Sequence, residues 1–350
     1  MSNTPAPAFA LTASRGFTDW LAAAGGALAF TTYQAGKLFL LGLKPDGSLS
    51  VFERSFPRAM GLGVSADGRM LMLATQVQLF RFDNILPPGE VQVIHDAVYA
   101  PHATWITGDL DIHDVGIGAG DRPVFANTLF NCVATVADGH SFRPLWQPPF
   151  ISRLAAEDRC HLNGLAMEGV EPRYVTCVSR SDISDGWRDR RSAGGIVVDV
   201  RTGAVVAEGL SMPHSPRLHH GRLWLLNSGT GQFGWVDPQR RHFTPLTFCP
   251  GYARGLAFAG GFAIVGLSRA RENRTFQGLA LDEALRRHDA DARCGLVVID
   301  LDTGDITDWI RIEGVIDEIF DVAVLPSVRC PALIGIKTPE IHRVISIAEG

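Results

Sequence analysis

One unit of short apolar strands and tight turns recurs along this chain at a spacing of roughly fifty residues. Its clearest copies are residues 195–203 (GIVVDVRTG) and 295–304 (GLVVIDLDTG). In each copy an apolar, β-branched strand leads into a turn, where Asp bonds nearby amides and Gly supplies a positive φ. A repeat of this kind without intervening helical periodicity indicates a propeller or a solenoid.

Two further short strands, joined by a tight turn, precede each copy of this unit. Residues 256–266 (LAFAGGFAIVG) show the pattern best. Six inner strands are predicted to begin near residues 60, 113, 163, 215, 254 and 320. A seventh copy is indicated at Trp20 to Tyr33, although Phe17 to Ala24 is equally compatible with a short amphipathic helix.

The pattern predicts a single all-β domain over residues 1–350, a β-propeller with seven blades favoured over six. With seven blades the last unit lacks an outer strand. Pro7 to Ala13 would supply it and clasp the two chain ends in one blade. Two β-sandwich domains are the alternative, but no low-complexity linker interrupts the repeat.

Two insertions break the even spacing, at residues 179–194 and 268–293, and the second contains an apparent helix from Leu281 to His288. Each follows the second strand of its unit, so both are expected to roof the channel mouth, where binding residues concentrate. The first insertion is interpreted as a lid with Trp187 as an apolar wall. A solvated loop pinned by its own ion pairs is the alternative.

Charge and cysteine content exclude several classes of partner and place the chain in the cytoplasm. The net charge of −5 supplies no basic field for nucleic acid or an anionic membrane. No apolar run approaches the roughly 20 residues that span a bilayer, and the first residues do not resemble a signal peptide. The six cysteines lie far apart without a CxxC pair, which indicates free thiols.

The residues just before each inner strand are unusually polar and should line the central channel. His113, His161 and His214, one from each of three successive units, are predicted to converge there. With a carboxylate from Asp111 or Glu318 they suit zinc, iron or manganese with an open coordination position. The alternative is a set of buried imidazoles that bond to backbone or water.

Three arginines, Arg58, Arg217 and Arg254, are expected near the same level of the mouth, where guanidinium groups bind carboxylate or phosphate. Internal salt bridges between blades are the alternative. Ser215 follows His214 directly, so the two side chains should face opposite ways and not act as nucleophile and base. No GxSxG or GxxxxGK[ST] motif occurs, and no nucleotide cofactor is expected.

Four longer motifs resemble an uncharacterised bacterial family of conserved hypothetical proteins. They are residues 31–38 (TTYQAGKL), 158–164 (DRCHLNG), 211–217 (SMPHSPR) and 250–256 (PGYARGL). The resemblance covers nearly the whole chain and implies a bacterial source and a propeller-like fold, without an established activity. More distantly, the architecture is similar to gluconolactonase-like, strictosidine-synthase-like and lyase propellers, which place a metal or polar cluster at the channel mouth.

The hypothesis is a metal-dependent hydrolase or lyase for a small anionic molecule or a peptide side chain. Two alternatives stay open: a propeller that binds such a ligand or peptide without turnover, and an iron-dependent redox enzyme. The candidate residues fall into three roles. They are His113, His161 and His214 for the metal; Asp111, Glu318 and Asn163 for catalysis; and Arg58, Arg217, Arg254, Ser215, Trp187 and Tyr252 for the substrate.

Overall fold

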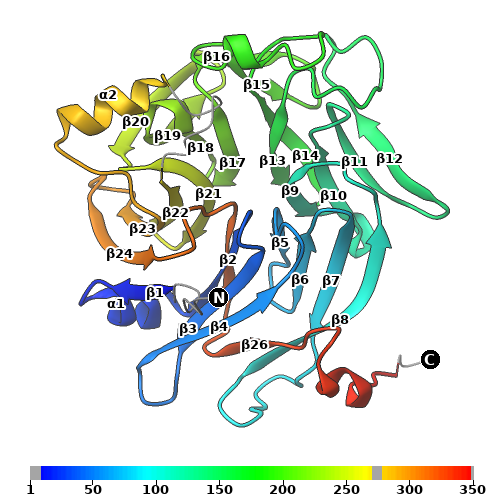
Figure 1. The fold of residues 1–350 in the computed structure, drawn as a ribbon, viewed down its shortest axis with the longest axis vertical. Helices are drawn as coiled ribbons and strands as arrows, with labels where there is room; N and C mark the ends of the chain where they lie inside the picture. Colours follow the sequence, from blue (N-terminus) through cyan, green and yellow to red (C-terminus); the bar gives the residue numbers. More distant parts are fainter. Residues whose placement is uncertain (1–8, 270–277, 348–350) are drawn as a thin grey trace, which may run out of the picture.

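A computed structural model describes residues 9–269 and 278–347, and in these residues six β-sheets surround a central axis as the blades of a propeller (Figure 1). The all-β propeller prediction is therefore confirmed, and the preference for seven blades is wrong. None of the helices in the described ranges is long and apolar enough to span a membrane.

Three blades are formed by four consecutive strands each, with the first strand of each innermost. They are β9–β12 (Ile112–Ile117, Pro123–Asn127, Cys132–Ala137, His140–Trp146), β13–β16 (Leu162–Glu168, Glu171–Cys177, Gly195–Asp199, Val205–Leu210) and β17–β20 (Pro213–His219, Arg222–Asn227, Gln232–Asp237, His242–Phe248). Short 3-10 turns η1 (Ala119–Asp121), η2 (Arg188–Arg190) and η3 (Ser228–Thr230) lie in their connections.

Two other blades carry a fifth strand on the outer edge. One consists of β5–β8 (Leu62–Val64, Met70–Ala74, Gln78–Asn84, Ala97–Ile106), with β26 (Pro331–Leu333) parallel to β8. The other consists of β21–β24 (Tyr252–Ala259, Phe262–Ser268, Gly295–Asp300, Ile306–Glu313), with β1 (Ala10–Ala13) antiparallel to β24. The helices are α1 (Phe17–Ala24) and α2 (Ala280–Arg287), and a 3-10 turn, η4 (Pro339–Arg343), follows β26.

The remaining blade closes the ring by combining strands from both ends of the sequence. Its innermost strand is β25 (Val322–Pro326), which pairs with β2 (Gly26–Thr32), followed by β3 (Lys37–Leu43) and β4 (Leu49–Ser55). The pairing runs antiparallel from Gly26 opposite Pro326 to Phe30 opposite Val322. The two ends of the chain are thus clasped in one blade, as predicted.

Two details of the predicted closure are wrong. The supposed seventh unit, Trp20 to Tyr33, contains α1 and β2, so its strand is the second strand of the closing blade. Ala10–Ala13 adds to β24 instead of completing the last unit, and Pro7 and Ala8 lie outside the described residues. The wrong assignment of β2 as the inner strand of a seventh blade has a physical cause. β2 is buried along almost its whole length, so its continuous apolar sequence resembles that of an inner strand.

The core lies between neighbouring sheets, where large apolar side chains from adjacent blades meet. Phe30 and Phe39 stack with ring centroids 4.7 Å apart and pack in one cluster with Ile264 and Leu296 of the next blade. All six cysteines are buried and free, which confirms the prediction of free thiols.

The inner strands share an irregularity close to the channel mouth. Equivalent pairs join the first and second strands of four blades: Ile112 with Asn127, Leu162 with Cys177, Pro213 with Asn227 and Ala253 with Leu267. A register shift follows each pair within a few residues. Because a bulge re-aims neighbouring side chains, the same local feature directs polar residues toward the channel mouth in four blades.

Candidate functional site

Left-handed backbone recurs at equivalent positions around the mouth. Arg58, Asp111, His161 and Met212 have φ values of 50°, 51°, 51° and 49°. Each stands two residues before a residue at a second set of equivalent positions, which are Met60, His113, Asn163 and His214, respectively. Such conformations cost a non-glycine residue of order 1–3 kcal/mol, and they cluster at functional sites.

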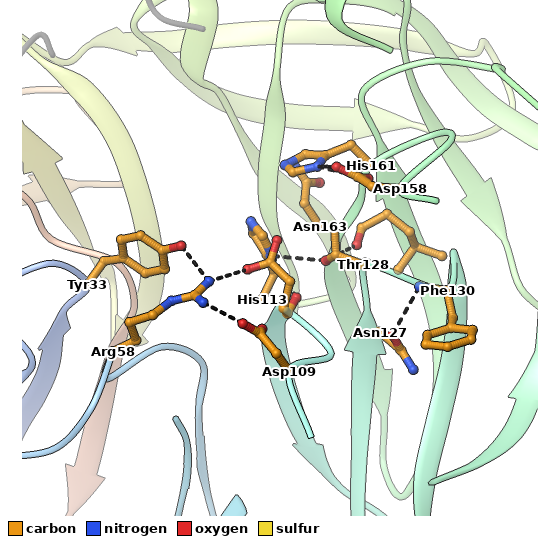
Figure 2. Close-up of polar contacts among 12 residues, drawn as sticks. Tyr33, Arg58, Asp109, His113, Asn127, Thr128, Phe130, Asp158, His161 and Asn163 are labelled. Atoms are coloured by element: carbon orange, nitrogen blue, oxygen red, sulfur yellow. Dashed lines mark hydrogen bonds and ion pairs between the residues drawn. The ribbon is translucent and has the colours of Figure 1, made fainter. Parts of the chain in front are cut away.

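The three predicted histidines converge. The ring of His113 lies 4.9 Å from that of His161, edge to face, and 6.5 Å from that of His214, measured between centroids. The three histidines do not occupy equivalent positions in their blades. When the blades are aligned, His161 falls at the position of Asp111, and Asn163 falls at the position of His113. Figure 2 shows both side chains: His113 lies on β9, and His161 directly precedes β13 of the next blade.

A hydrogen bond at Nδ1 fixes each imidazole. Nδ1 of His113 lies 2.9 Å from the carbonyl oxygen of Asp111, and Nδ1 of His214 lies 2.8 Å from that of Met212. Nδ1 of His161 lies 2.9 Å from Oδ2 of Asp158 (Figure 2). Carbonyl and carboxylate oxygens only accept, so each Nδ1 carries a hydrogen, and in the neutral form of each ring Nε2 keeps its lone pair.

Thr128 supports this assignment for His113. The Thr128 hydroxyl donates its hydrogen to the carbonyl oxygen of Leu162 at 2.6 Å. The Oγ1 atom of Thr128 therefore has no hydrogen left for His113 and accepts from Nδ1 of His113 at 2.9 Å. Burial, with a smaller contribution from Arg254, lowers the pKa of His113 and of His214 well below the ordinary histidine value. Both side chains are therefore neutral at physiological pH.

Asn163 contacts His214 directly. Its Nδ2 donates to Nε2 of His214 at 3.1 Å, while its Oδ1 accepts from the Thr176 hydroxyl at 2.9 Å. Tyr252 lies edge to face with the His214 ring at 5.7 Å. The Oγ atom of Ser215 instead accepts from the amide of Gly255 at 3.0 Å and ties two inner strands together.

The three predicted arginines lie in different surroundings. Nη1 of Arg254 lies 3.4 Å from a Glu318 oxygen, and its guanidinium packs 3.8 Å from the centroid of the Phe320 ring. Burial lowers the pKa of Arg254, which means that the nearby carboxylates do not compensate the cost of burying its charge. This site is therefore electrostatically suited to an additional anion.

Arg58 is more fully paired. Its guanidinium donates to Asp109 at 2.7 Å, to the hydroxyl of Tyr33 at 2.6 Å and to Asp111 at 3.3 Å (Figure 2). Burial raises the pKa of Asp111 above the ordinary value. Arg217 takes no place in this group: it donates to both oxygens of Asp114, at 2.7 and 3.1 Å. Internal ion pairs therefore engage all three arginines, and the pair of Arg254 with Glu318, at 3.4 Å, is the sole ion pair that Arg254 makes among the described residues.

The insertion at residues 179–194 reaches the histidines through Trp187. This side chain is only 1% exposed and stacks on the His161 ring at 4.1 Å. Its Nε1 donates to Oδ2 of Asp158 at 2.9 Å, the same oxygen that receives Nδ1 of His161. Trp187 thus covers one face of His161 and helps to orient its carboxylate partner.

The described part of the second insertion extends this cover at the rim. Leu281 and Leu285 of α2 share an apolar cluster with Trp187, Met212 and Tyr252. Figure 1 shows α2 near the edge of the disc, beside β19 and β20. Residues 270–277 of the predicted roof lie outside the described residues.

Sequence reasoning missed Asp158, Thr128 and Tyr33 as members of this site. Asp158 and Tyr33 stand inside two of the long motifs, at residues 158–164 and 31–38, which was the available signal. Across residues 9–269 and 278–347, no group of three or more His, Cys, Asp or Glu side chains is arranged so that it could hold a metal ion.

Comparison with one solved structure supports the fold. The chain resembles the crystal structure of a nidogen/laminin complex with a TM-score of 0.54 and 11% identity, covering 87% of this chain and 99% of that chain. A protein of unknown function from Bacteroides caccae gives a TM-score of 0.48 at 8% identity, covering 85% and 98% of the two chains. No curated protein matches the sequence. A family model, by contrast, matches residues 15–334, and the chain belongs to that family, described as a domain of unknown function, DUF4915.

Proposed function

We propose that the channel mouth is the active site of a metal-dependent hydrolase or lyase that acts on a small anionic molecule. The observation that carries this proposal is the shared orientation of the imidazoles: Nδ1 is the anchored donor, so Nε2 keeps the lone pair. Within the described ranges, no hydrogen bond reaches Nε2 of His113 or His161. Metal-binding histidines characteristically donate their other ring N–H to a carboxylate or carbonyl oxygen in this way.

The charges around the mouth also favour a cation. Four carboxylates (Asp109, Asp111, Asp158 and Glu318) surround it, against the guanidinium groups of Arg58 and Arg254. A divalent ion would offset this excess of negative charge. In this proposal Nε2 of His113 and His161 bind zinc, iron or manganese, and Asp111 is the third ligand after a small side-chain rotation.

The other residues then have distinct roles. Arg254, whose charge is incompletely compensated, binds the anionic group of the substrate. His214, whose two ring nitrogens bond to Met212 and Asn163, positions the Asn163 amide, and Glu318 is the candidate general base. A bound divalent ion would polarise the substrate and activate a water molecule.

Elemental analysis of protein purified without a histidine tag tests the metal. We expect about one equivalent of a transition metal in the wild type, and a loss of at least about tenfold in His113→Ala and His161→Ala. His140→Ala, an exposed change on β12, is the matched control and should keep its metal. The wild-type protein is also refolded or reconstituted with zinc, iron and manganese salts. If it still contains no metal after that treatment, the metal assignment is wrong.

Binding without turnover is the second candidate, because the buried Arg254 favours an anion whether or not a metal is present. The two functions differ in what the metal-loaded protein does with carboxylate and phosphate esters and with lactones. An enzyme turns one of them over, and Arg254→Met weakens that reaction. A binding protein retains the ligand unchanged, and Arg254→Met weakens its affinity in calorimetry.

A further inference from the structure

A second group of reactive side chains lies on the outer side of the β5–β8 blade, away from the channel mouth. Oγ of Ser346 is 3.3 Å from Nε2 of His102, and Nδ1 of His102 is 3.0 Å from Oδ2 of Asp83. Asp83 and His102 stand on β7 and β8. Ser346 follows η4, in the segment that β26 brings alongside β8 through its parallel pairing.

We propose that Ser346, His102 and Asp83 are the nucleophile, general base and orienting carboxylate of a separate esterase site. The order of contacts is the one this chemistry needs. Because Nδ1 donates to the carboxylate, Nε2 presents its lone pair to the serine hydroxyl. The 3.3 Å contact is at the long end of hydrogen bonding, which is common where no substrate is bound.

A cavity of about 850 Å³ adjoins this group and is lined by both His102 and Ser346. Much of its remaining wall is apolar and includes Val93, Val98, Ile334 and Ile345. Such a wall suits a short alkyl chain, whereas the imidazole and hydroxyl suit the ester carbonyl. The substrate class is therefore a carboxylic ester with a short apolar acyl group.

Two arginines near the triad carry additional roles. Arg81 binds Asp83 through Nε, at 3.0 Å from each oxygen, and so holds the carboxylate that orients His102. Arg54 lines the same cavity with its guanidinium over the Phe52 ring at 4.2 Å. Its Nε is buried and has no hydrogen-bond acceptor among the described residues. Because its side chain lines the cavity, Arg54 is the candidate donor to the oxyanion.

Water is the only co-reactant that this ester hydrolysis needs. Oγ of Ser346 attacks the ester carbonyl carbon while its proton moves to Nε2 of His102. The C–O bond to the alcohol then breaks, and the departing oxygen takes that proton. Water attacks the acyl-serine, passes a proton to His102, and the released Ser346 oxygen recovers it as the carboxylic acid leaves.

A fluorophosphonate probe tests the nucleophile, because its phosphorus forms a covalent bond to an activated serine as fluoride leaves. Mass spectrometry of the labelled wild type should place the adduct on Ser346. Ser346→Ala should abolish that adduct, and His102→Gln should slow its formation at least about 100-fold. The matched control is Ser141→Ala, which changes an exposed serine on β12, and this variant should be labelled at the wild-type rate.

Hydrolysis of p-nitrophenyl acetate and butyrate gives the second readout, with the same ranking of variants expected. The adduct on Ser346 is specific to this site whatever the channel mouth does to the esters, so labelling lets the two sites fail independently. No adduct on Ser346, or equal labelling of wild type and His102→Gln with unchanged circular dichroism, would overturn the proposal. Ser346 lies beyond the residues matched by the family, so the activity is expected of this chain and not of every relative.

Discussion

Below the histidines, one buried ion-paired group links five of the six inner strands. Arg217 on β17 binds Asp114 on β9 and lies 3.5 Å from Asp321, next to β25. The two carboxylates also accept from backbone amides of β5 and β13, those of Leu62 and Leu165. Burial, together with the charge of Asp114, raises the pKa of Asp321 to about 7.

The raised pKa of Asp321 predicts a pH-dependent contribution to stability. Between pH 4 and 7 the folded state holds a proton on Asp321 that the unfolded chain has released, because the ordinary pKa is near 3.8. The wild-type free energy of unfolding therefore falls with rising pH relative to that of Asp321→Asn. Urea unfolding of both proteins at several pH values between 4.5 and 7.5 measures this difference.

An exposed carboxylate is the matched control for that experiment. Hydrogen bonds, foremost from Ser65, lower the pKa of Asp67, so Asp67 is ionised in both states throughout this pH range. The stability difference between wild type and Asp67→Asn should stay constant with pH. A constant difference for Asp321→Asn as well would contradict the raised pKa.

At the residue scale, the sequence predicted several of the side chains that gather at the mouth. It did not predict which atoms these side chains contact. His113 and His214 follow from their place just before apolar inner strands. The carboxylate that receives Nδ1 of His161 is Asp158, and its approach depends on left-handed φ values of 41° at Asp158 and 51° at His161. Such backbone values in non-glycine residues are not readable from residue type.

At the scale of elements, the 179–194 insertion is a structured cover attached at its base. Arg159 donates to Asp182 at 2.6 Å and to Glu157 at 2.8 Å, and the amide of Asp185 donates to the Glu157 carbonyl oxygen. Trp187 adds the apolar contact with α2. That this segment acts as a lid over a functional site, with Trp187 as its apolar wall, stays a prediction.

Two substitutions of Trp187 separate its packing from its hydrogen bond. Trp187→Phe keeps a ring against His161 and loses only the bond to Asp158, for a cost of about 1 kcal/mol. Trp187→Ala also empties the apolar cluster, for about 3–5 kcal/mol, most of which should appear as local opening of the insertion. Hydrogen exchange of peptides from residues 179–194 should be much faster in the alanine variant and nearly unchanged in Trp187→Phe.

Peptides from β6 and β7, which belong to a different blade from the insertion, provide the internal reference and should keep their protection in both variants. If Trp187→Ala leaves the exchange of the insertion unchanged, Trp187 does not hold it closed. If Trp187→Phe opens it as far as alanine does, the bond to Asp158 contributes more than the packing.

The starts of the six inner strands were predictable because each follows a recurring local pattern of apolar residues and turns. The blade count was not, since it depends on whether β2 begins a blade or joins β25. That pairing connects residues about 300 positions apart, such as Gly26 and Pro326. A pairing between such distant residues cannot be predicted from local sequence patterns.

At the scale of the whole molecule, closure through β25 should decide whether the propeller folds. A chain ended at Asp317 lacks β25 and leaves β2 without its inner partner, so we expect aggregation or loss of the cooperative unfolding transition. A chain ended at Ile334 keeps both β25 and β26 and should fold as the full chain does. Circular dichroism and size-exclusion chromatography of the two truncations distinguish these outcomes, and a monomeric, cooperatively folding 1–317 chain would contradict them.

The repeated left-handed backbone at the mouth also bears on how such a site changes during evolution. Arg58, Asp111, His161 and Met212 carry a guanidinium, a carboxyl group, an imidazole and a thioether, yet all four occupy the same conformation. The scaffold therefore accepts side chains of unrelated chemistry there without altering its backbone. A relative of this propeller can acquire a different specificity by single substitutions in this ring while inheriting the rest of the fold intact.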